Sequence, residues 1–359
     1  MSETKKLKVG IIGTGSISAS HIAGYEALGN VEIYAACDIN EQRVRECARR
    51  HGIPHVFTDY HEMLKLDELD AVSVCTWNSV HAPAAIAALQ AGKHVLCEKP
   101  MALNTAQALA MKRAAAESGK ILMIGFVRRF GNDAAILKDF IDAGMLGDIY
   151  YSKATYLRRA GFPGGWFGDK SRSGGGPLID LGVHVIDLVR YLSGKPKAVS
   201  VSGATFHRLG ARQDLIQNAR YTASDTAPAP FDVEDMAVAM IRFDNGSLLS
   251  LETSFSLNLP APVNNIELFG TKSGARLDPK LTFASEMNHY LVDVTPALDT
   301  ALSFDGLFEN EIAHFVDCVR TGKPVRSPAE DGVEIMRIID AVYASAKTGH
   351  EVAVDRTEG

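Results

Sequence analysis

The chain has 359 residues, of which 46% are hydrophobic and 22% charged, and its formal net charge is −6. These fractions are typical of globular proteins and argue against a disordered chain or a membrane protein. Charges of both signs are spread along the sequence without a basic block, so we expect no nucleic-acid partner.

The amino terminus and the cysteines indicate the compartment. A polar opening leads into an apolar run at residues 7–12, which is too short for a membrane span and lacks the features of a signal peptide. The five cysteines are scattered and form no CxxC pair, which is typical of buried thiols in a reducing compartment. We therefore expect a cytoplasmic protein with no membrane partner.

Short apolar runs alternate with helical patterns through the first third of the chain. This alternation predicts βαβ units and a doubly wound parallel sheet, and hence an α/β Rossmann domain over residues 1–126. We expect strands at residues 8–13, 31–37, 71–75, 94–97 and 121–126, and helices at residues 17–28, 41–50, 82–91 and 105–118.

The pattern changes after residue 126 and becomes rich in strands. We predict an α+β domain over residues 127–359 with a large, mostly antiparallel open sheet, whose late helices pack back on the first domain. Asp244-Asn-Gly246 predicts a hairpin turn. Residues 159–177 are predicted to form a loop over the site, and residues 219–231 an excursion on the surface. The expected strands are 149–156, 198–206, 236–243, 247–256 and 264–269, and the helices 132–143, 307–320 and 329–348.

The first predicted strand is joined to the first helix by a glycine-rich motif, Gly10-Ile-Ile-Gly13-Thr-Gly15-Ser16-Ile17-Ser18. Gly13 permits a tight turn, and Gly15 lets the backbone approach a pyrophosphate at the positive end of the helix. Because Ser18 stands at the third glycine position, the motif alone is equally consistent with an ordinary glycine turn in a parallel sheet.

Asp38 favours a nucleotide site. It ends the second predicted strand, where an acidic side chain accepts hydrogen bonds from the adenosine ribose and repels a 2′-phosphate. Arg43 lies near enough to accommodate such a phosphate. We expect NAD, with NADP less favoured, bound by Gly13, Gly15, Ser16, Ile17, Asp38 and Arg43.

Two further clusters indicate chemistry. Lys99, in Cys97-Glu98-Lys99-Pro100, ends a predicted buried strand, at the sheet edge where α/β proteins bind ligands. The alternative is a solvated lysine before a proline turn.

The second cluster lies on a predicted helix. Asp180, His184 and Asp187 are spaced i, i+4 and i+7 and share one face of that helix. A histidine oriented by a carboxylate can remove a hydroxyl proton. The alternatives are a helix-stabilising pair or two metal ligands, but no third ligand is at hand and we expect no metal.

Together these motifs resemble those of the Gfo/Idh/MocA oxidoreductase family. The resemblance spans residues 7–190 and implies an NAD-dependent sugar or inositol dehydrogenase, commonly a homodimer or homotetramer. It rests on Gly13 and Gly15, Asp38, Thr76-Trp77-Asn78 with His81, Glu98-Lys99-Pro100, Gly125-Phe-Val-Arg128-Arg129, and the glycine-led segment with Asp180 and His184.

The resemblance implies a role for each matching residue. Lys99 contacts the reacting hydroxyl and helps relay its proton, His184 accepts that proton, and Asp180 binds the substrate. Further contacts are implied with the cofactor for Thr76, Asn78, His81, Glu98, Lys99 and Arg128, and with the substrate for Arg128 and Asp187.

Substrate recognition should come from side chains outside these motifs. Trp77 replaces the family's usual proline, so it either narrows the pocket or is a core aromatic residue. Trp166 can stack on a sugar ring, and Arg158 and Arg159 can donate to its hydroxyls. We expect oxidation of a secondary ring hydroxyl of a sugar, glycoside or inositol; the alternatives are an NAD-dependent glycosidase or a non-catalytic nucleotide-bound sensor.

Overall fold

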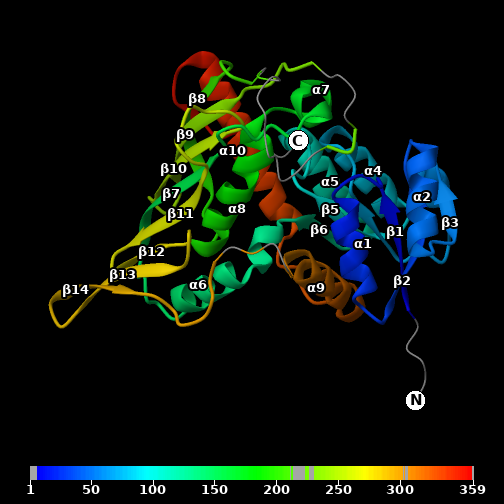
Figure 1. Cartoon of the computed structure of the whole chain (residues 1–359), viewed down its shortest axis with the longest axis horizontal. Coiled ribbons are helices and arrows are strands. Elements are labelled where there is room, and N and C mark those ends of the chain that lie inside the picture. Colours follow the sequence, from blue (N-terminus) through cyan, green and yellow to red (C-terminus); the bar gives the residue numbers. More distant parts are fainter. Residues whose placement is uncertain are drawn as a thin grey trace.

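The computed structural model describes residues 6–210, 212, 223–225, 230–301, 303 and 306–357, which form two sheets flanked by helices (Figure 1). Within the predicted surface excursion, residues 219–222 and 226–229 lie outside the described residues. No helix in the described part of the chain is long and apolar enough to cross a membrane.

The first sheet is parallel throughout and has the strand order β3-β2-β1-β4-β5-β6. This is the doubly wound Rossmann order, in which the connections change direction between β1 and β4 and open a crevice at the carboxyl edge. The predicted α/β fold of the first third is confirmed. Its strands are β1 (Leu7–Ile12), β2 (Val31–Cys37), β3 (His55–Phe57), β4 (Ala71–Val74), β5 (His94–Glu98) and β6 (Leu122–Gly125).

Local sequence signals set the ends of the connecting helices. Asn40 and Asn104 accept hydrogen bonds from backbone N–H groups at the starts of α2 and α5, and Gly52 and Gly119 end the same helices in the left-handed conformation. β3 and α3 have only three and four residues, too few for a periodic pattern in the sequence to predict them. The helices are α1 (Ser18–Glu26), α2 (Glu41–His51), α3 (Tyr60–Met63), α4 (Asn78–Gln90) and α5 (Thr105–Ser118).

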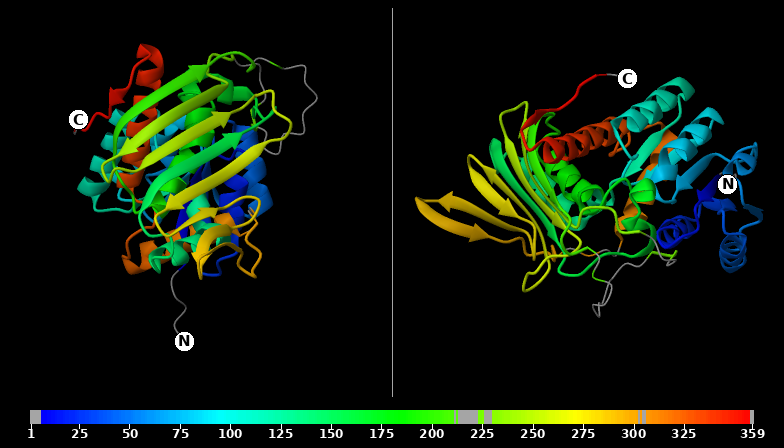
Figure 2. Two further views of the ribbon diagram at one scale, coloured as in Figure 1. Left: turned by 90° about the vertical axis from the view of Figure 1, so that its left-hand side faces the viewer. Right: turned by 90° about the horizontal axis from the view of Figure 1, so that it is seen from above.

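The second sheet has nine strands in the order β14-β13-β12-β11-β7-β10-β9-β8-β15 (Figure 2). All its pairs are antiparallel except β7 with β10, so the predicted mostly antiparallel sheet is confirmed. Its strands are β7 (Ile149–Leu157), β8 (Ala198–Phe206), β9 (Met236–Phe243), β10 (Leu248–Ser254), β11 (Val263–Gly270), β12 (Ser273–Arg276), β13 (Thr282–Met287), β14 (Tyr290–Val294) and β15 (Val352–Ala353).

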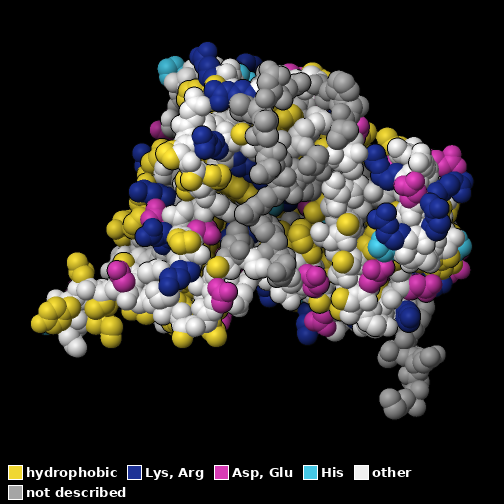
Figure 3. Space-filling view, in the orientation of Figure 1, with side chains coloured by type: hydrophobic (Ala, Val, Ile, Leu, Met, Phe, Trp, Pro, Cys, Tyr) yellow, Lys and Arg dark blue, Asp and Glu magenta, His cyan; other side chains and the backbone are white. Residues whose placement is uncertain are grey.

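Helices cover one face of this sheet and leave the other open. The covering helices α8 (Val183–Leu192) and α10 (Ala329–Thr348) contact β7 and β8, and α6 (Asn132–Asp142) packs beside α8 (Figure 2). The β13–β14 hairpin projects beyond them and carries exposed hydrophobic side chains (Figure 3), including Met287, Tyr290 and Leu291.

The late helix α9 (Leu307–Thr321) packs against the first sheet. Its Ile312 and Phe315 share a buried cluster with Val9, Ile11 and Met123, which come from strands of that sheet. The apolar core of the first sheet therefore depends on residues from the far end of the chain. The predicted domain boundary after residue 126 stays a prediction.

A buried ion cluster also joins distant segments. Arg129, in the 3₁₀ turn Val127–Phe130, is fully buried and donates to Asp187 of α8 at 2.6 and 2.9 Å and to Asp331 of α10 at 2.8 Å. Arg190 and Lys195 add positive charge around Asp331. Because each buried carboxylate faces a cation, the cluster avoids the large cost of an unpaired buried charge.

Candidate active site

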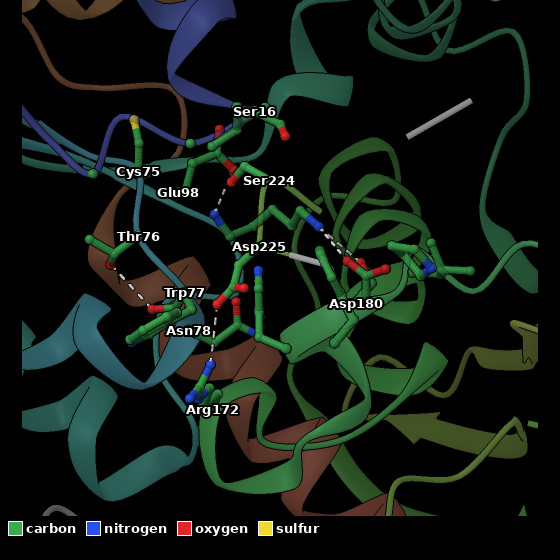
Figure 4. A pocket seen from close by; sticks show the side chains of 18 of the residues that line it. Ser16, Cys75, Thr76, Trp77, Asn78, Glu98, Arg172, Asp180, Ser224 and Asp225 are labelled. Atoms are coloured by element: carbon green, nitrogen blue, oxygen red, sulfur yellow. Dashed lines mark hydrogen bonds and ion pairs between the residues drawn. The ribbon is translucent and has the colours of Figure 1, made fainter. Parts of the chain in front are cut away.

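A cavity of about 1760 Å³ opens between the two sheets (Figure 4). Its wall includes the carboxyl ends of β1, β2, β4 and β5 on one side and the ends of β7 and β11 on the other. Ligands of open α/β sheets bind at this edge. The predicted site residues in the wall are Gly13, Gly15, Ser16, Ile17, Asp38, Arg43, Thr76, Asn78, Glu98, Lys99, Arg158, Trp166, Asp180 and His184.

The glycine motif forms a turn that a side chain could not enter. Gly13 has a φ of +90°, and a Cβ there would lie 2.6 Å from the carbonyl oxygen of Cys75. Ser18, at the third position of the motif, begins α1 and donates from Oγ to the Gly15 carbonyl at 2.6 Å. The turn and the start of α1 therefore leave a cradle of backbone groups at the cavity, which suits a pyrophosphate.

Residues 223–225 of the predicted surface excursion lie against this turn, and Ser224 is exposed. Ser224 and Asp225 line the cavity, and a Cβ on Gly15 would come within 2.8 Å of the Ser224 Oγ. Ala223 is buried and donates its backbone N–H to the Pro163 carbonyl at 3.1 Å. The segment is held by the loop that precedes Trp166.

Asp38 is fixed at the end of β2. One carboxylate oxygen accepts from the Thr14 backbone N–H at 2.8 Å and from its hydroxyl at 3.0 Å, and the other from the Asn40 N–H at 2.9 Å. Arg43 lies 3.6 Å from the same carboxylate. Because Asp38 lines the cavity, it stands where the adenosine ribose of a dinucleotide would bind, so the residues present fit NAD.

The turn after β4 connects the first sheet to the loops of the second. Asn78 is buried and donates its amide to the Ser173 carbonyl at 2.7 Å. Trp77 lines the cavity and stacks against the Arg172 guanidinium, which lies 4.6 Å from the ring centre and 3.6 Å from Asp225. Figure 4 shows Trp77, Arg172 and Asp225 together on one side of the pocket. Trp77 is thus a wall residue and not part of the core.

His81 lies behind the cavity wall, and its contact with the cofactor stays a prediction. Its ring is buried between two backbone carbonyls, that of Pro100 at 2.7 Å and that of Thr76 at 3.1 Å. Burial lowers the pKa of His81 despite these hydrogen bonds, so its imidazole is neutral near pH 7. The side chain links the turn after β4 to the Lys99–Pro100 turn.

Glu98 is held from behind by a buried histidine. His21 of α1 contacts the Glu98 Oε1 at 2.9 Å through Nε2 and the Ser73 hydroxyl at 3.1 Å through Nδ1. Burial alone would lower the pKa of His21, but the Cys75 and Glu98 side chains outweigh it and raise that pKa. The pair therefore places a carboxylate with a fixed orientation in the cavity wall.

Lys99 meets the second half of the molecule directly. Its ammonium donates to the Asp180 carboxylate at 2.8 Å and to the Asp180 carbonyl at 3.2 Å. Figure 4 shows Asp180 across the pocket from Trp77. Both side chains are mostly buried but line the cavity, so the lysine is neither a solvated strand end nor a core residue.

His184 lies at the start of α8, after a π-helical turn over Leu178–Gly182. Burial lowers its pKa well below the usual range, and the positive charges of Lys99, Arg128 and Arg158 lower it further. Its Nδ1 is buried without a hydrogen-bond partner among the described residues. A neutral imidazole in the cavity wall can accept a proton.

Arg128 and Asp187 lie outside the cavity wall, so the implied contacts of Arg128 with cofactor and substrate, and of Asp187 with substrate, stay predictions. Arg128 is buried in an ion pair with Asp133 at 3.1 Å. Asp187 forms the buried pair with Arg129. Asp180 lies in the π-helical turn, whereas Asp187 lies in α8 and faces the ion cluster.

Sequence analysis missed several wall residues because no local pattern marks them. Tyr156 of β7 and Asn264 of β11 are paired across the sheet and line the cavity, and Phe308 enters it from α9. The buried carbonyl oxygen of the Asn264 side chain has no partner in the described part of the chain. The Glu98 partner His21 was equally unmarked, since a lone histidine in a helix carries no signal of its own.

Comparisons with known proteins agree with this geometry. Residues 7–126 match the oxidoreductase family's NAD-binding Rossmann fold, and residues 138–354 match its C-terminal alpha/beta domain. The chain belongs to the Gfo/Idh/MocA family. The predicted resemblance and the predicted NAD cofactor are confirmed, and the chain is an NAD-dependent oxidoreductase.

Similar proteins match over nearly their whole lengths. The D-glucoside 3-dehydrogenase of Escherichia coli is 35% identical, with 96% of this chain and 97% of that protein covered. The myo-inositol 2-dehydrogenase of Thermotoga maritima is 26% identical over 98% of this chain and all of its own. A levoglucosan dehydrogenase structure in complex with NADH superposes with a TM-score of 0.86 at 26% identity, covering 98% of this chain and 100% of that one.

Proposed function

We propose that the protein oxidises a secondary ring hydroxyl of a sugar, glycoside or inositol, with NAD as the hydride acceptor. One observation carries the proposal: the Lys99–Asp180 pair and the neutral His184 line the same cavity as the glycine turn and Asp38. An amine, a carboxylate and a proton acceptor beside a nucleotide site are the groups that alcohol oxidation needs.

Residues of this chain take the hydroxyl proton and stabilise the charge that develops on the hydroxyl oxygen. His184 takes the proton from the reacting hydroxyl, because its low pKa keeps the imidazole neutral. The Lys99 ammonium stabilises the negative charge that develops on the hydroxyl oxygen. When bound, NAD accepts the hydride from the carbon that bears this oxygen, so the alcohol becomes a ketone and one proton is released.

Asp180 orients the lysine. The ammonium is held at 2.8 Å by the Asp180 carboxylate, which limits the positions that the Lys99 side chain can take. The one remaining N–H donor of the ammonium is available to a substrate oxygen. We assign substrate contacts to Asp180, His184, Lys99, Arg158 and Trp166, and cofactor contacts to the motif residues, Asp38, Arg43, Thr76, Asn78 and Glu98.

The D-glucoside 3-dehydrogenase of E. coli, the relative at 35% identity, favours a glycoside as the first substrate to test. A cytoplasmic location, a homodimer or homotetramer and a site without metal stay predictions.

The test is a spectrophotometric screen for NADH formation at 340 nm. The purified protein is incubated with NAD and a panel of alkyl glycosides, free aldoses and inositols. We expect NADH with at least one ring polyol and one equivalent of a keto sugar, identified by borodeuteride reduction. Glycosidic cleavage without net NADH would indicate a glycosidase, and NAD binding without turnover of any panel member would contradict the proposal.

A further inference from the structure

The charges of the described residues in the cavity wall do not cancel. Each carboxylate in the described wall has a cation within 4 Å: Asp38 has Arg43 at 3.6 Å, Glu98 has His21 at 2.9 Å, Asp180 has Lys99 at 2.8 Å, and Asp225 has Arg172 at 3.6 Å.

Three arginines of the wall remain without a carboxylate among the described residues. Arg159 contacts the Pro260 carbonyl at 3.4 Å, and Arg212 contacts the Asn258 side-chain oxygen at 2.9 Å. Arg158 contacts the Gly161 carbonyl at 2.9 Å and the Tyr156 hydroxyl at 3.3 Å. Within the described part of the chain all three therefore meet only neutral partners, and Arg158 and Arg159 directly follow β7.

Arg158 is held in place before any ligand arrives. Its guanidinium lies 5.2 Å from the centre of the Tyr156 ring, and a Cβ on Gly161 would fall 2.4 Å from the Arg158 Cδ. Its backbone is fixed by hydrogen bonds to and from Ser254 at 3.0 to 3.2 Å. A guanidinium that is already positioned loses little side-chain entropy on binding, and it retains free N–H donors.

Arg158 also lies near the proposed reaction centre. Arg158 and His184 line the same cavity, and the charge of Arg158 is one of those that lower the pKa of His184. The other two nearby cations, Lys99 and Arg128, are already paired with Asp180 and Asp133. One uncompensated positive charge therefore faces the space that the sugar ring would fill.

We infer that the preferred substrate carries an anionic group on the sugar, bound by Arg158, and that this group is a carboxylate. The inference rests on the proposed function and narrows its substrate class to uronic acids and their glycosides. A planar carboxylate matches the fork of one guanidinium, and the one charge of Arg158 balances a monoanion. Arg159, which is exposed, and Arg212 add a positive field at the opening that would favour entry of such a substrate.

The cofactor does not explain these arginines. Its pyrophosphate belongs at the Gly13–Gly15 turn and its adenosine ribose at Asp38, at the opposite side of the cavity from β7 and β11. The stability of the fold does not explain Arg158 either, because its guanidinium joins no ion pair in the described structure.

The test compares three substrates that share a ring and differ in charge: methyl β-D-glucoside, methyl β-D-glucuronide, and glucose 6-phosphate as the phosphate arm. We measure kcat/KM with the wild type, with Arg158→Gln, and with Arg276→Gln as the control, because Arg276 is an exposed arginine of β12 outside the cavity. We expect the wild type to prefer the glucuronide, and its glucuronide-to-glucoside ratio to fall about 10- to 100-fold in Arg158→Gln, the usual effect of losing a charged hydrogen bond. The control should keep the wild-type ratio.

A binding measurement separates this inference from the proposed reaction. Calorimetric titration of the NADH-loaded protein with each sugar reports the anion site without turnover. Glucuronide binding that weakens in Arg158→Gln, without NADH formation from any sugar, would keep the anion site and remove the proposed reaction.

Three results would overturn the inference. One is a wild type that binds and oxidises the neutral glucoside at least as well as the glucuronide, and another is a glucuronide-to-glucoside ratio unchanged by Arg158→Gln. The third is a preference for glucose 6-phosphate over the glucuronide, which would replace the carboxylate by a phosphate.

A second variant tests the position of Arg158. Gly161→Ala displaces the Arg158 side chain and should lower the glucuronide-to-glucoside ratio of kcat/KM.

Discussion

The cofactor side and the substrate side of the cavity are built differently. On the cofactor side, the backbone of one turn and a few residues at strand ends form the site, and every carboxylate has a nearby cation. On the substrate side, side chains arrive from β7, β11 and two long loops, and three arginines have no carboxylate partner in the described structure. The first side suits a constant ligand, whereas under the proposed function the second would set which sugar is accepted.

Lys99 lies between the two sides, and its removal should have the largest effect on activity. We expect Lys99→Ala to lower kcat by about 10²- to 10⁴-fold, the usual contribution of a group that handles protons or charge in the transition state. The affinity for NADH, measured by fluorescence titration, should change little, because the glycine turn and Asp38 remain. Lys347→Ala, at an exposed site on α10, is the control. Full activity of the Lys99 variant would remove the lysine from the mechanism.

The ion cluster behind the cavity should have the largest effect on stability. Arg129→Met leaves Asp187 and Asp331 buried with one cation fewer, so we expect a loss of about 3–5 kcal/mol in the free energy of unfolding. Urea denaturation measures the loss. The double variant Arg129→Met/Asp187→Leu removes one of the stranded charges and should recover part of it. A loss below about 1 kcal/mol in the single variant would show that the cluster is hydrated.

On the cofactor side, Asp38 should determine the preference for NAD over NADP. In Asp38→Ser the carboxylate no longer repels a 2′-phosphate and Arg43 loses its partner, so the kcat/KM ratio of NAD to NADP should fall about 10- to 100-fold. Asp67→Ser, on the surface of the same domain, should keep the wild-type ratio. An unchanged ratio in Asp38→Ser would place the ribose elsewhere.

His21 acts through Glu98, so its substitution should have a smaller effect on the kinetics than that of Asp38. His21→Gln keeps a hydrogen-bond donor but removes the positive charge behind the carboxylate, so we expect KM for NAD to rise about 3- to 10-fold and by more than kcat falls. His51→Gln, which breaks the outer pair with Glu26, is the matched control. If kcat falls while KM for NAD stays constant, His21 affects the chemistry and not the binding of the cofactor.

The pH profile gives the smallest and most specific signal. A proton acceptor must be unprotonated, and the folded environment lowers the pKa of His184, so kcat/KM should stay high as the pH falls through 6.5 and decline only below it. Arg158→Gln removes one of the charges that lower this pKa, and should move the acid limb to higher pH. An acid limb that is identical in the two proteins would disprove the coupling.

Sequence reasoning reached the cofactor side because its signals are local. The glycine turn, Asp38 and Lys99 each follow a predicted strand, and the carboxyl ends of parallel strands meet at one edge. The substrate side depends on long-range pairing, since β7 lies between β10 and β11, about a hundred residues later in the chain. That pairing brings Asn264 beside Tyr156, and no short sequence pattern could predict that these two residues are neighbours.

Contacts implied by the resemblance depend on the same long-range packing. The resemblance implies a substrate contact for Asp187, but in the structure this residue follows the π-helical turn and pairs with Arg129. Arg128 and His81 matched family motifs, yet each is occupied by partners behind the wall, Asp133 in one case and two backbone carbonyls in the other. Short elements such as β3 and α3 were missed because they are too short to show a period.

The position of α9 has a consequence for biosynthesis. Ile312, Phe315 and Val316 cover an apolar face formed in part by Val9 and Ile11. A ribosome has almost completed the chain before these helix residues emerge, so the nascent Rossmann sheet waits with that face open to solvent or to chaperones. A fragment that stops at residue 126 would carry the nucleotide motif but not the cover of its own core, and we expect it to aggregate when expressed alone.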